Sequence, residues 1–203
     1  MSIADLYRRV RRGAPIIVVS GLPRSGTSMA MKMLDAGGVP TLADGIRAAD
    51  EDNPEGYYEF ERVKELDKNG DTRWLRQARG KAVKIISFLL TYLPDTFEYR
   101  VIFMDRNLDE VLASQQKMLV RRGEASGTSQ DPHMRQVYQE HLAKVDRFLN
   151  ARTCFATLRL GYRNVIDNPA VEARRIDEFL GGRLNVERMA AVADRRLYRH
   201  RQS

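Results

Sequence analysis

Apolar residues recur along the chain with two different spacings, and each spacing predicts one kind of element. Continuous runs rich in β-branched or aromatic residues predict buried strands at residues 16–19, 81–88, 99–104 and 153–158. Apolar residues three and four positions apart predict helices over residues 3–12, 27–36, 59–78, 89–93, 109–118, 133–150, 171–180 and 186–193. No linker or internal repeat divides this series, so we expect one domain over residues 1–203, which ends in a basic tail at 195–203.

The first strand leads into a loop that we expect to bind a phosphate group. Gly21 and Gly26 enclose the loop, and Thr27 and Ser28 begin the helix that follows. Backbone N–H groups in such a strand–loop–helix unit point inward, and the helix dipole favours an anion there. The glycine spacing is that of a Walker A motif, but Thr27 replaces the lysine and the loop carries its cation, Arg24, at the centre. The bound anion should therefore differ from the end of a nucleoside triphosphate.

A second candidate anion site follows the strand at residues 99–104. This strand ends at Asp105 and Arg106, and Ser114 lies on the next helix. A guanidinium group can clamp a phosphate with two hydrogen bonds, and a hydroxyl adds an uncharged donor. The alternative for Arg106 is a residue that caps the edge of the sheet.

Lys84 and an acidic segment are further candidates. Lys84 lies within the predicted strand 81–88, where an unpaired ammonium group is costly to bury. It either faces a ligand or extends to water from the edge of the strand. Residues 39–58 form a long loop with carboxylates beside aromatic residues, which favours either a functional segment or an acidic surface loop over disorder.

Composition limits the partners. The net charge of +7 suits a polyanionic ligand or a basic solvated surface. Cys154 is the only cysteine and is expected to be a buried thiol, and His133, His141 and His200 lack metal-ligand spacing. Because no apolar run resembles a signal peptide or reaches membrane-spanning length, we expect no membrane span and a cytoplasmic location.

The loop at residues 23–28, Pro-Arg-Ser-Gly-Thr-Ser, resembles the 5′-phosphosulfate loop of sulfotransferases that use 3′-phosphoadenosine 5′-phosphosulfate (PAPS). A strand that runs into Arg106, followed by Ser114, resembles the second signature of that family, and residues 53–59 and 160–169 resemble further segments. The resemblance spans about residues 15–198. It implies a three-layer, P-loop-like α/β fold with a central parallel sheet and helices on both faces. Many relatives with an Arg-type loop are membrane proteins, so the lack of an anchor suggests a bacterial-type form.

The resemblance also implies a role for each candidate residue. Arg24 and Lys84 would stabilise the sulfonate and the leaving group, and Arg106 and Ser114 would hold the 3′-phosphate. Tyr162 would lie near the nucleotide, although the Glu-Asp pair that usually follows this tyrosine is Arg-Asn here. The 5′-phosphate would be held by the loop residues Pro23, Arg24, Ser25, Gly26, Thr27 and Ser28. The product is adenosine 3′,5′-bisphosphate, and no metal is required.

The acceptor must lose a proton to a base. Relatives with an Arg-type loop use a carboxylate downstream of it, which makes Asp44, Glu55 and Glu59 candidates. We favour Glu59 because it lies at the end of the acidic segment beside aromatic residues. The acceptor is expected to be a hydroxyl or an amine on a small molecule, a carbohydrate or a lipid, and a homodimer is possible.

Other functions remain open at this point. Asp105 follows an apolar strand, so it could hold magnesium as a Walker B residue in a P-loop kinase. The same fold could also bind a nucleotide or a sulfated ligand without catalysis. Nucleic-acid binding ranks last, because basic and aromatic residues are not interleaved as a single-strand platform requires.

Overall fold

A computed structural model describes residues 13–45, 58–68, 70–121, 123 and 132–193. Three expectations from the sequence lie outside the described residues. These are the basic helix at 3–12, the basic tail at 195–203, and most of the acidic segment, including the candidate base Glu55.

The centre of the fold is a parallel sheet of four strands. The strands are β1 (Ile16–Gly21), β2 (Ala82–Lys84), β3 (Tyr99–Asp105) and β4 (Phe155–Gly161), in the spatial order β2-β1-β3-β4. From β1 the chain crosses first to β2 on one side and then to β3 on the other side. This reversal places a switch point between the carboxyl ends of β1 and β3, which is where open α/β sheets bind ligands.

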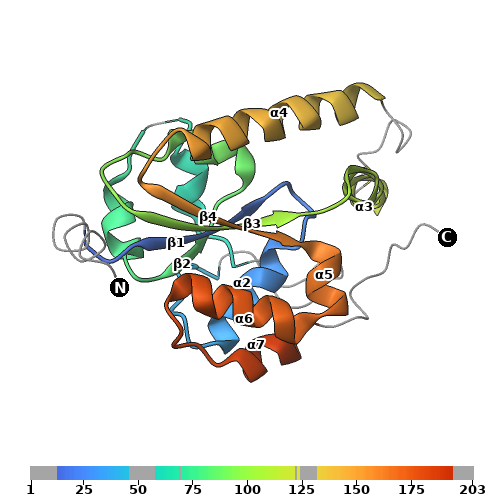
Figure 1. The fold of residues 1–203 in the computed structure, drawn as a ribbon. Coiled ribbons are helices and arrows are strands. Elements are labelled where there is room, and N and C mark those ends of the chain that lie inside the picture. The colour runs from blue at the N-terminus through green and yellow to red at the C-terminus, as the bar shows by residue number, and fades with distance from the viewer. Residues whose placement is uncertain (1–12, 46–57, 69, 122, 124–131, 194–203) are drawn as a thin grey trace.

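Helices cover both faces of the sheet, so the predicted three-layer α/β fold is confirmed (Figure 1). Apolar side chains that alternate along each strand fill the two cores. On one face lie α2 (Thr27–Ala36), α5 (Tyr162–Asp167), α6 (Pro169–Leu180) and α7 (Val186–Val192). On the other face lie α4 (Pro132–Asn150) and three 3₁₀ helices, η1 (Glu61–Glu65), η2 (Arg73–Ala78) and η3 (Ser87–Tyr92). The remaining helix, α3 (Leu108–Arg121), follows the carboxyl end of β3.

The larger differences from the sequence prediction concern three predicted elements. The predicted strand 81–88 is wrong beyond Lys84, because Ser87 begins η3. The predicted helix 59–78 is two separate 3₁₀ helices, and the strand predicted at 153–158 runs from Phe155 to Gly161. Helix α5 was not predicted. The buried apolar runs fixed which residues face the core, but not the kind of element that carries them.

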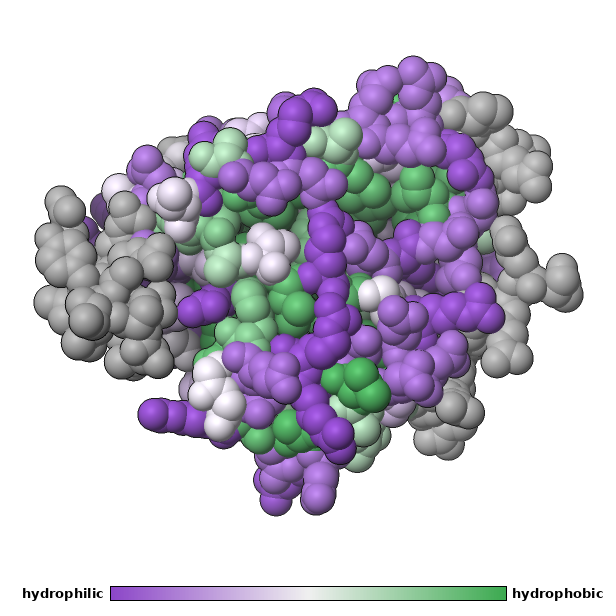
Figure 2. Space-filling view, viewed as in Figure 1, coloured by the Kyte–Doolittle hydropathy of each residue, from purple (hydrophilic) through white to green (hydrophobic). Residues whose placement is uncertain are grey.

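The outer edge of β4 is crossed by a polar network. Nη1 of Arg159, in β4, donates to both carboxylate oxygens of Asp105 at the end of β3, at 2.7 and 2.9 Å. Nη2 of Arg159 donates to the carboxylate of Asp146 in α4. The carbonyl oxygen of Arg159 accepts a hydrogen bond of 3.1 Å from Arg175 of α6. Figure 2 shows a stripe of hydrophilic residues at the centre of the front, with hydrophobic patches on both sides of it. This network links the helices of both faces to the edge strand.

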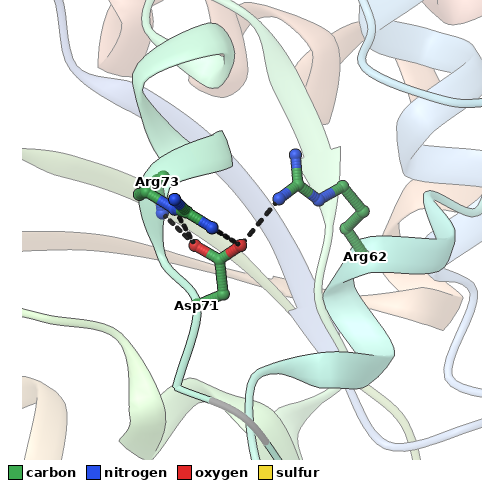
Figure 3. A network of polar contacts seen from close by, with 3 residues as sticks. All are labelled: Arg62, Asp71 and Arg73. Atoms are coloured by element: carbon green, nitrogen blue, oxygen red, sulfur yellow. Dashed lines mark hydrogen bonds and ion pairs between the residues drawn. The ribbon is translucent and has the colours of Figure 1, made fainter.

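A second polar network joins η1 to η2 (Figure 3). Asp71 accepts hydrogen bonds from the backbone N–H and the guanidinium of Arg73, and from the guanidinium of Arg62 in η1 at 2.8 Å. The hydrogen bond from the Arg73 side chain is the main cause that holds the pKa of Asp71 well below its usual range. The carboxylate therefore caps the start of η2 and ties it to η1.

The packing of α6 is testable with two variants of one helix. Ile176 is fully buried on the inner face of α6, whereas Arg174 is exposed. We expect Ile176→Ala to lower the free energy of unfolding by about 2–5 kcal/mol, because it leaves a cavity in the core. The matched variant Arg174→Ala should change it by less than about 0.5 kcal/mol. Urea denaturation followed by circular dichroism measures both, and equal effects would show that α6 does not pack through this face.

Candidate functional site

The candidate site lies at the switch point between β1 and β3. The pairing of these strands runs in register from Ile16 and Tyr99 to Gly21 and Met104, so the two strands end at the same edge. The loop after β1 turns through a hydrogen bond of 3.1 Å from the Ser25 N–H to the Leu22 carbonyl. Both predicted motifs, the phosphate loop and the end of β3, therefore meet at one edge of the sheet.

Both glycines of the loop lie so close to neighbouring residues that a side chain would not fit. A Cβ atom on Gly21 would lie 2.6 Å from the carbonyl oxygen of Met104 on β3. A Cβ atom on Gly26 would lie 2.4 Å from the ring of Tyr162, the first residue of α5. Gly26 also has a φ of 100°, a left-handed conformation that side chains disfavour. The loop is thus packed tightly against both β3 and α5.

Arg24, the cation of the loop, is itself in a left-handed conformation, with a φ of 71°. A residue with a Cβ atom pays about 1–2 kcal/mol for this backbone, so surrounding contacts must hold it. Two hydrogen bonds do so. The Nε of Arg24 donates to the Oγ of Ser114 at 3.0 Å, and the carbonyl of Arg24 accepts from Nη1 of Arg106 at 2.9 Å. The two predicted anion-binding motifs are therefore in direct contact with each other.

The contacts of the Arg106 guanidinium include a carbonyl, a carboxylate and an aromatic ring. Its Nη1 donates to the Arg24 carbonyl, its Nε donates to Glu110 at 2.9 Å, and its Cζ atom lies over the ring of Tyr162, 4.3 Å from the ring centre. The side chain of Arg106 is only 8% exposed. Burial raises the pKa of the Tyr162 phenol, with the charge of Arg106 partly opposing this, so the phenol stays protonated. Tyr162, predicted to lie near the nucleotide, thus lies between Gly26 and Arg106.

Helix α3 is positioned by its first turn and by a small apolar cluster. The side chain of Asn107 accepts a hydrogen bond of 2.8 Å from the Asp109 N–H, which caps the start of the helix. Val111 and Leu112 pack with Leu22 of the phosphate loop and with α4. This packing fixes α3 against the loop and brings Ser114, which is buried, to Arg24.

The loop contains a buried hydroxyl group that suits an anion. The Oγ atoms of Ser25 and Ser20 are buried and have no hydrogen-bond partner in the part of the chain that the structure describes. Ser25 lies in the loop itself, beside the buried Thr27 at the start of α2. Because a buried hydroxyl without a partner is unfavourable, the loop fits an anionic group that accepts a hydrogen bond.

Lys84 is buried rather than extended to water. Its side chain is 8% exposed, and its ammonium group lies 3.7 Å from a carboxylate oxygen of Glu59. The other oxygen of Glu59 lies 3.8 Å from the exposed Lys64. The structure thus brings together two of the predicted catalytic residues, Lys84 and Glu59. Asp44, another candidate base, instead accepts a hydrogen bond of 2.6 Å from the Glu61 N–H at the start of η1.

Two residues near the site were missed by the sequence analysis. Glu110 was given no role from the sequence, although it lies four positions after Arg106 and forms an ion pair with it. His141 was noted only as lacking metal-ligand spacing, but its Nε2 lies 2.9 Å from Ser87 Oγ and its ring stacks on Phe88 at 3.9 Å. Burial lowers the pKa of His141, with Lys144 adding to this effect. No signal in the sequence links His141 to η3.

Comparisons with known proteins found neither a matching family model nor a matching curated protein. Solved structures with a similar fold include the sulfotransferase domain of the curacin biosynthetic pathway, at 17% identity and a TM-score of 0.46, which covers 83% of this chain and 74% of that one. A sulfotransferase from Alicyclobacillus acidocaldarius is 15% identical with a TM-score of 0.47, over 82% of this chain and 81% of that one. A sugar kinase from Janibacter is 15% identical with a TM-score of 0.40, over 89% and 99%.

The described part of the chain lacks a membrane-spanning helix and a cluster of metal ligands. None of the helices in this part of the chain is long and apolar enough to cross a membrane. No group of three or more histidine, cysteine, aspartate or glutamate side chains within it could hold a metal ion.

The contact between the loop and Tyr162 is testable with matched glycine variants. Gly26 and Gly181 share nearly the same backbone conformation, with φ and ψ of 100° and 15° against 110° and 16°, but Gly181 has open space around it. Gly181→Ala should cost about 1–2 kcal/mol of unfolding free energy for the backbone alone. Gly26→Ala should cost about 1–3 kcal/mol more, because its methyl group would collide with the Tyr162 ring. Equal losses in chemical denaturation would contradict this packing.

Proposed function

We propose that the protein is a sulfotransferase that transfers a sulfonate group from PAPS to a hydroxyl or amine acceptor. The observation that carries the proposal is the convergence of Arg24 with Arg106 and Ser114 at the switch point. A phosphate loop and a separate Arg–Ser pair offer two neighbouring places for anions, which suits a nucleotide with one phosphate group on its 5′ oxygen and another on its 3′ oxygen.

We propose that some residues of the site hold the donor, and that others lie near the sulfonate group that is transferred. The loop amides, the unpartnered Ser25 hydroxyl and Arg24 suit the 5′-phosphosulfate, and Arg106 with Ser114 suits the 3′-phosphate. The donor supplies an activated sulfonate group, and its phosphate leaves as an anion. Lys84, at the end of β2, offers a positive charge that stabilises developing negative charge. Catalysis by such residues is mostly positioning and charge stabilisation.

Glu59 is proposed as the base that takes the proton of the acceptor. Its carboxylate lies beside the ammonium group of Lys84, so a proton acceptor and a cation lie together. Asp44 is less suited, because its carboxylate binds the backbone at the start of η1. We propose that the acceptor is carried by a small molecule, a carbohydrate or a lipid.

One observation weakens the kinase alternative. A Walker B carboxylate must be presented to magnesium and its nucleotide. Asp105 instead has both carboxylate oxygens bound to Arg159, which is also bound to Asp146. The loop in addition carries Thr27 where the Walker lysine belongs. Asp105 therefore serves the packing of β3 against β4 and α4.

A second observation bears on the non-catalytic alternative. The departure from the sulfotransferase pattern after Tyr162 falls on Arg163 and Asn164, and both side chains are exposed. Neither takes part in the cluster of Arg24, Arg106 and Ser114. The departure therefore leaves the proposed donor site unchanged.

The donor site can be tested by calorimetry in metal-free buffer. We expect the wild-type protein to bind adenosine 3′,5′-bisphosphate, and Arg106→Ala to weaken binding by at least about tenfold, because a charged hydrogen bond to phosphate is lost. The matched control is Arg163→Ala, which removes an exposed arginine from the start of α5 and should leave binding unchanged. Binding of ATP only in the presence of magnesium, with no binding of the bisphosphate, would overturn the proposal.

Asp105→Asn separates the sulfotransferase from the kinase. If Asp105 is structural, the variant should bind adenosine 3′,5′-bisphosphate as the wild type does. Its free energy of unfolding should fall by about 1 kcal/mol or less, since the pair with Arg159 is partly exposed. Calorimetry and urea denaturation measure the two quantities. A variant that keeps its stability but loses magnesium-dependent nucleotide binding would support the kinase instead.

A further inference from the structure

We propose that Glu110 is a positioning residue that couples the two phosphate subsites by acting through Arg106. This inference rests on the proposed function, because it assumes that a nucleotide with phosphate groups occupies the site. Glu110 lies in the first turn of α3, and its Oε2 accepts the hydrogen bond from Nε of Arg106 at 2.9 Å. The side chains of Arg106 and Glu110 are only 8% and 14% exposed.

The low exposure of Arg106 and Glu110 strengthens the hydrogen bond between them. A charge-assisted hydrogen bond that is shielded from water is stronger than a neutral one, and removal of one partner leaves the other charge buried. Arg106 precedes α3 by two residues, and the spacing of four along the chain lets Glu110, in the first turn of the helix, reach back to it. Glu110 therefore limits the positions that the guanidinium can take, and Tyr162 beneath its plane limits them further.

The second step runs from Arg106 to the phosphate loop. Nη1 of Arg106 donates to the carbonyl of Arg24, the residue whose left-handed backbone needs support. That hydrogen bond fixes the direction of the peptide group in the middle of the loop. The side chain of Arg24 in turn reaches Ser114 on α3. The loop and the Arg–Ser motif are thus joined by reciprocal hydrogen bonds, and Glu110 orients the residue that makes one of them.

This chain of contacts has a consequence for ligands that occupy one subsite only. If Arg106 and Glu110 served the 3′-phosphate alone, a ligand without that phosphate would not sense their loss. If they also hold the loop, a ligand that carries only a 5′-phosphate must bind more weakly once Glu110 is removed. A simple repulsion between Glu110 and the 3′-phosphate predicts the opposite sign for the bisphosphate, because removal of the carboxylate would then tighten binding.

Calorimetry with adenosine 5′-phosphate and adenosine 3′,5′-bisphosphate tests the proposal on the full-length protein. Glu110→Ala should weaken both ligands by about tenfold, the effect of one charged hydrogen bond. Glu110→Gln should lose less, because its amide oxygen can still accept from Nε of Arg106. Asp109→Ala is the matched control, since it removes a carboxylate from the same first turn of α3 and should leave both affinities unchanged. In the Arg106→Ala background, Glu110→Ala should have no further effect on adenosine 5′-phosphate.

The outcomes separate this proposal from the proposed function. Unfolding midpoints of all variants establish that each is folded. If Glu110→Ala does not fold, Glu110→Gln still provides the test. Unchanged binding of adenosine 5′-phosphate, tighter binding of the bisphosphate, or additive effects in the double variant would overturn the role of Glu110 while the nucleotide site stands. Failure of the wild type to bind either nucleotide would overturn the proposed function and this inference with it.

Discussion

The contact on which the site depends is the hydrogen bond from Arg106 to the main-chain carbonyl of Arg24. Parallel pairing of β1 with β3 brings the phosphate loop and Arg106 to one edge of the sheet. The hydrogen bond then holds the loop in a backbone conformation that a residue with a side chain disfavours. The local turn from Leu22 to Ser25, closed by its own hydrogen bond, already favours a left-handed residue after Pro23. The hydrogen bond from Arg106 adds a support from outside the loop, and the side chain of Arg24 reaches Ser114 from this backbone.

The fold could be predicted from the sequence where the pattern of apolar residues and the end signals agree. The helix 27–36 was predicted with its observed limits, because a glycine loop precedes it and Gly37 follows it. Residues 81–88 were predicted less well. Their apolar run is compatible with both a strand and a buried 3₁₀ helix. The 3₁₀ helix that begins at Ser87 packs against α4, and the local sequence does not encode this contact.

The site was predictable as two motifs but not as one cluster. Arg24 and Ser114 were assigned to different phosphate groups, yet they share a hydrogen bond across 90 positions of the chain. Such a contact follows from strand order and register, which a single sequence does not give. Glu110 had one local signal, its spacing of four from Arg106, but Arg106 lies before the helix, so this spacing alone did not predict their contact. His141 had none, because its partner Ser87 is 54 positions away.

The balance of charges explains how the site can keep cations buried. Arg106 is paired with Glu110 and Lys84 with Glu59, so each buried cation has a carboxylate beside it. Burial of a charge without such a partner would be costly. Arg24 differs, because its side chain donates a hydrogen bond to the hydroxyl of Ser114. This hydroxyl is uncharged, so the contact does not neutralise the positive charge of Arg24. Under the proposed function, the charge of Arg24 at the centre of the loop would therefore act on the donor directly, while the paired cations would contribute through the geometry in which their carboxylates hold them.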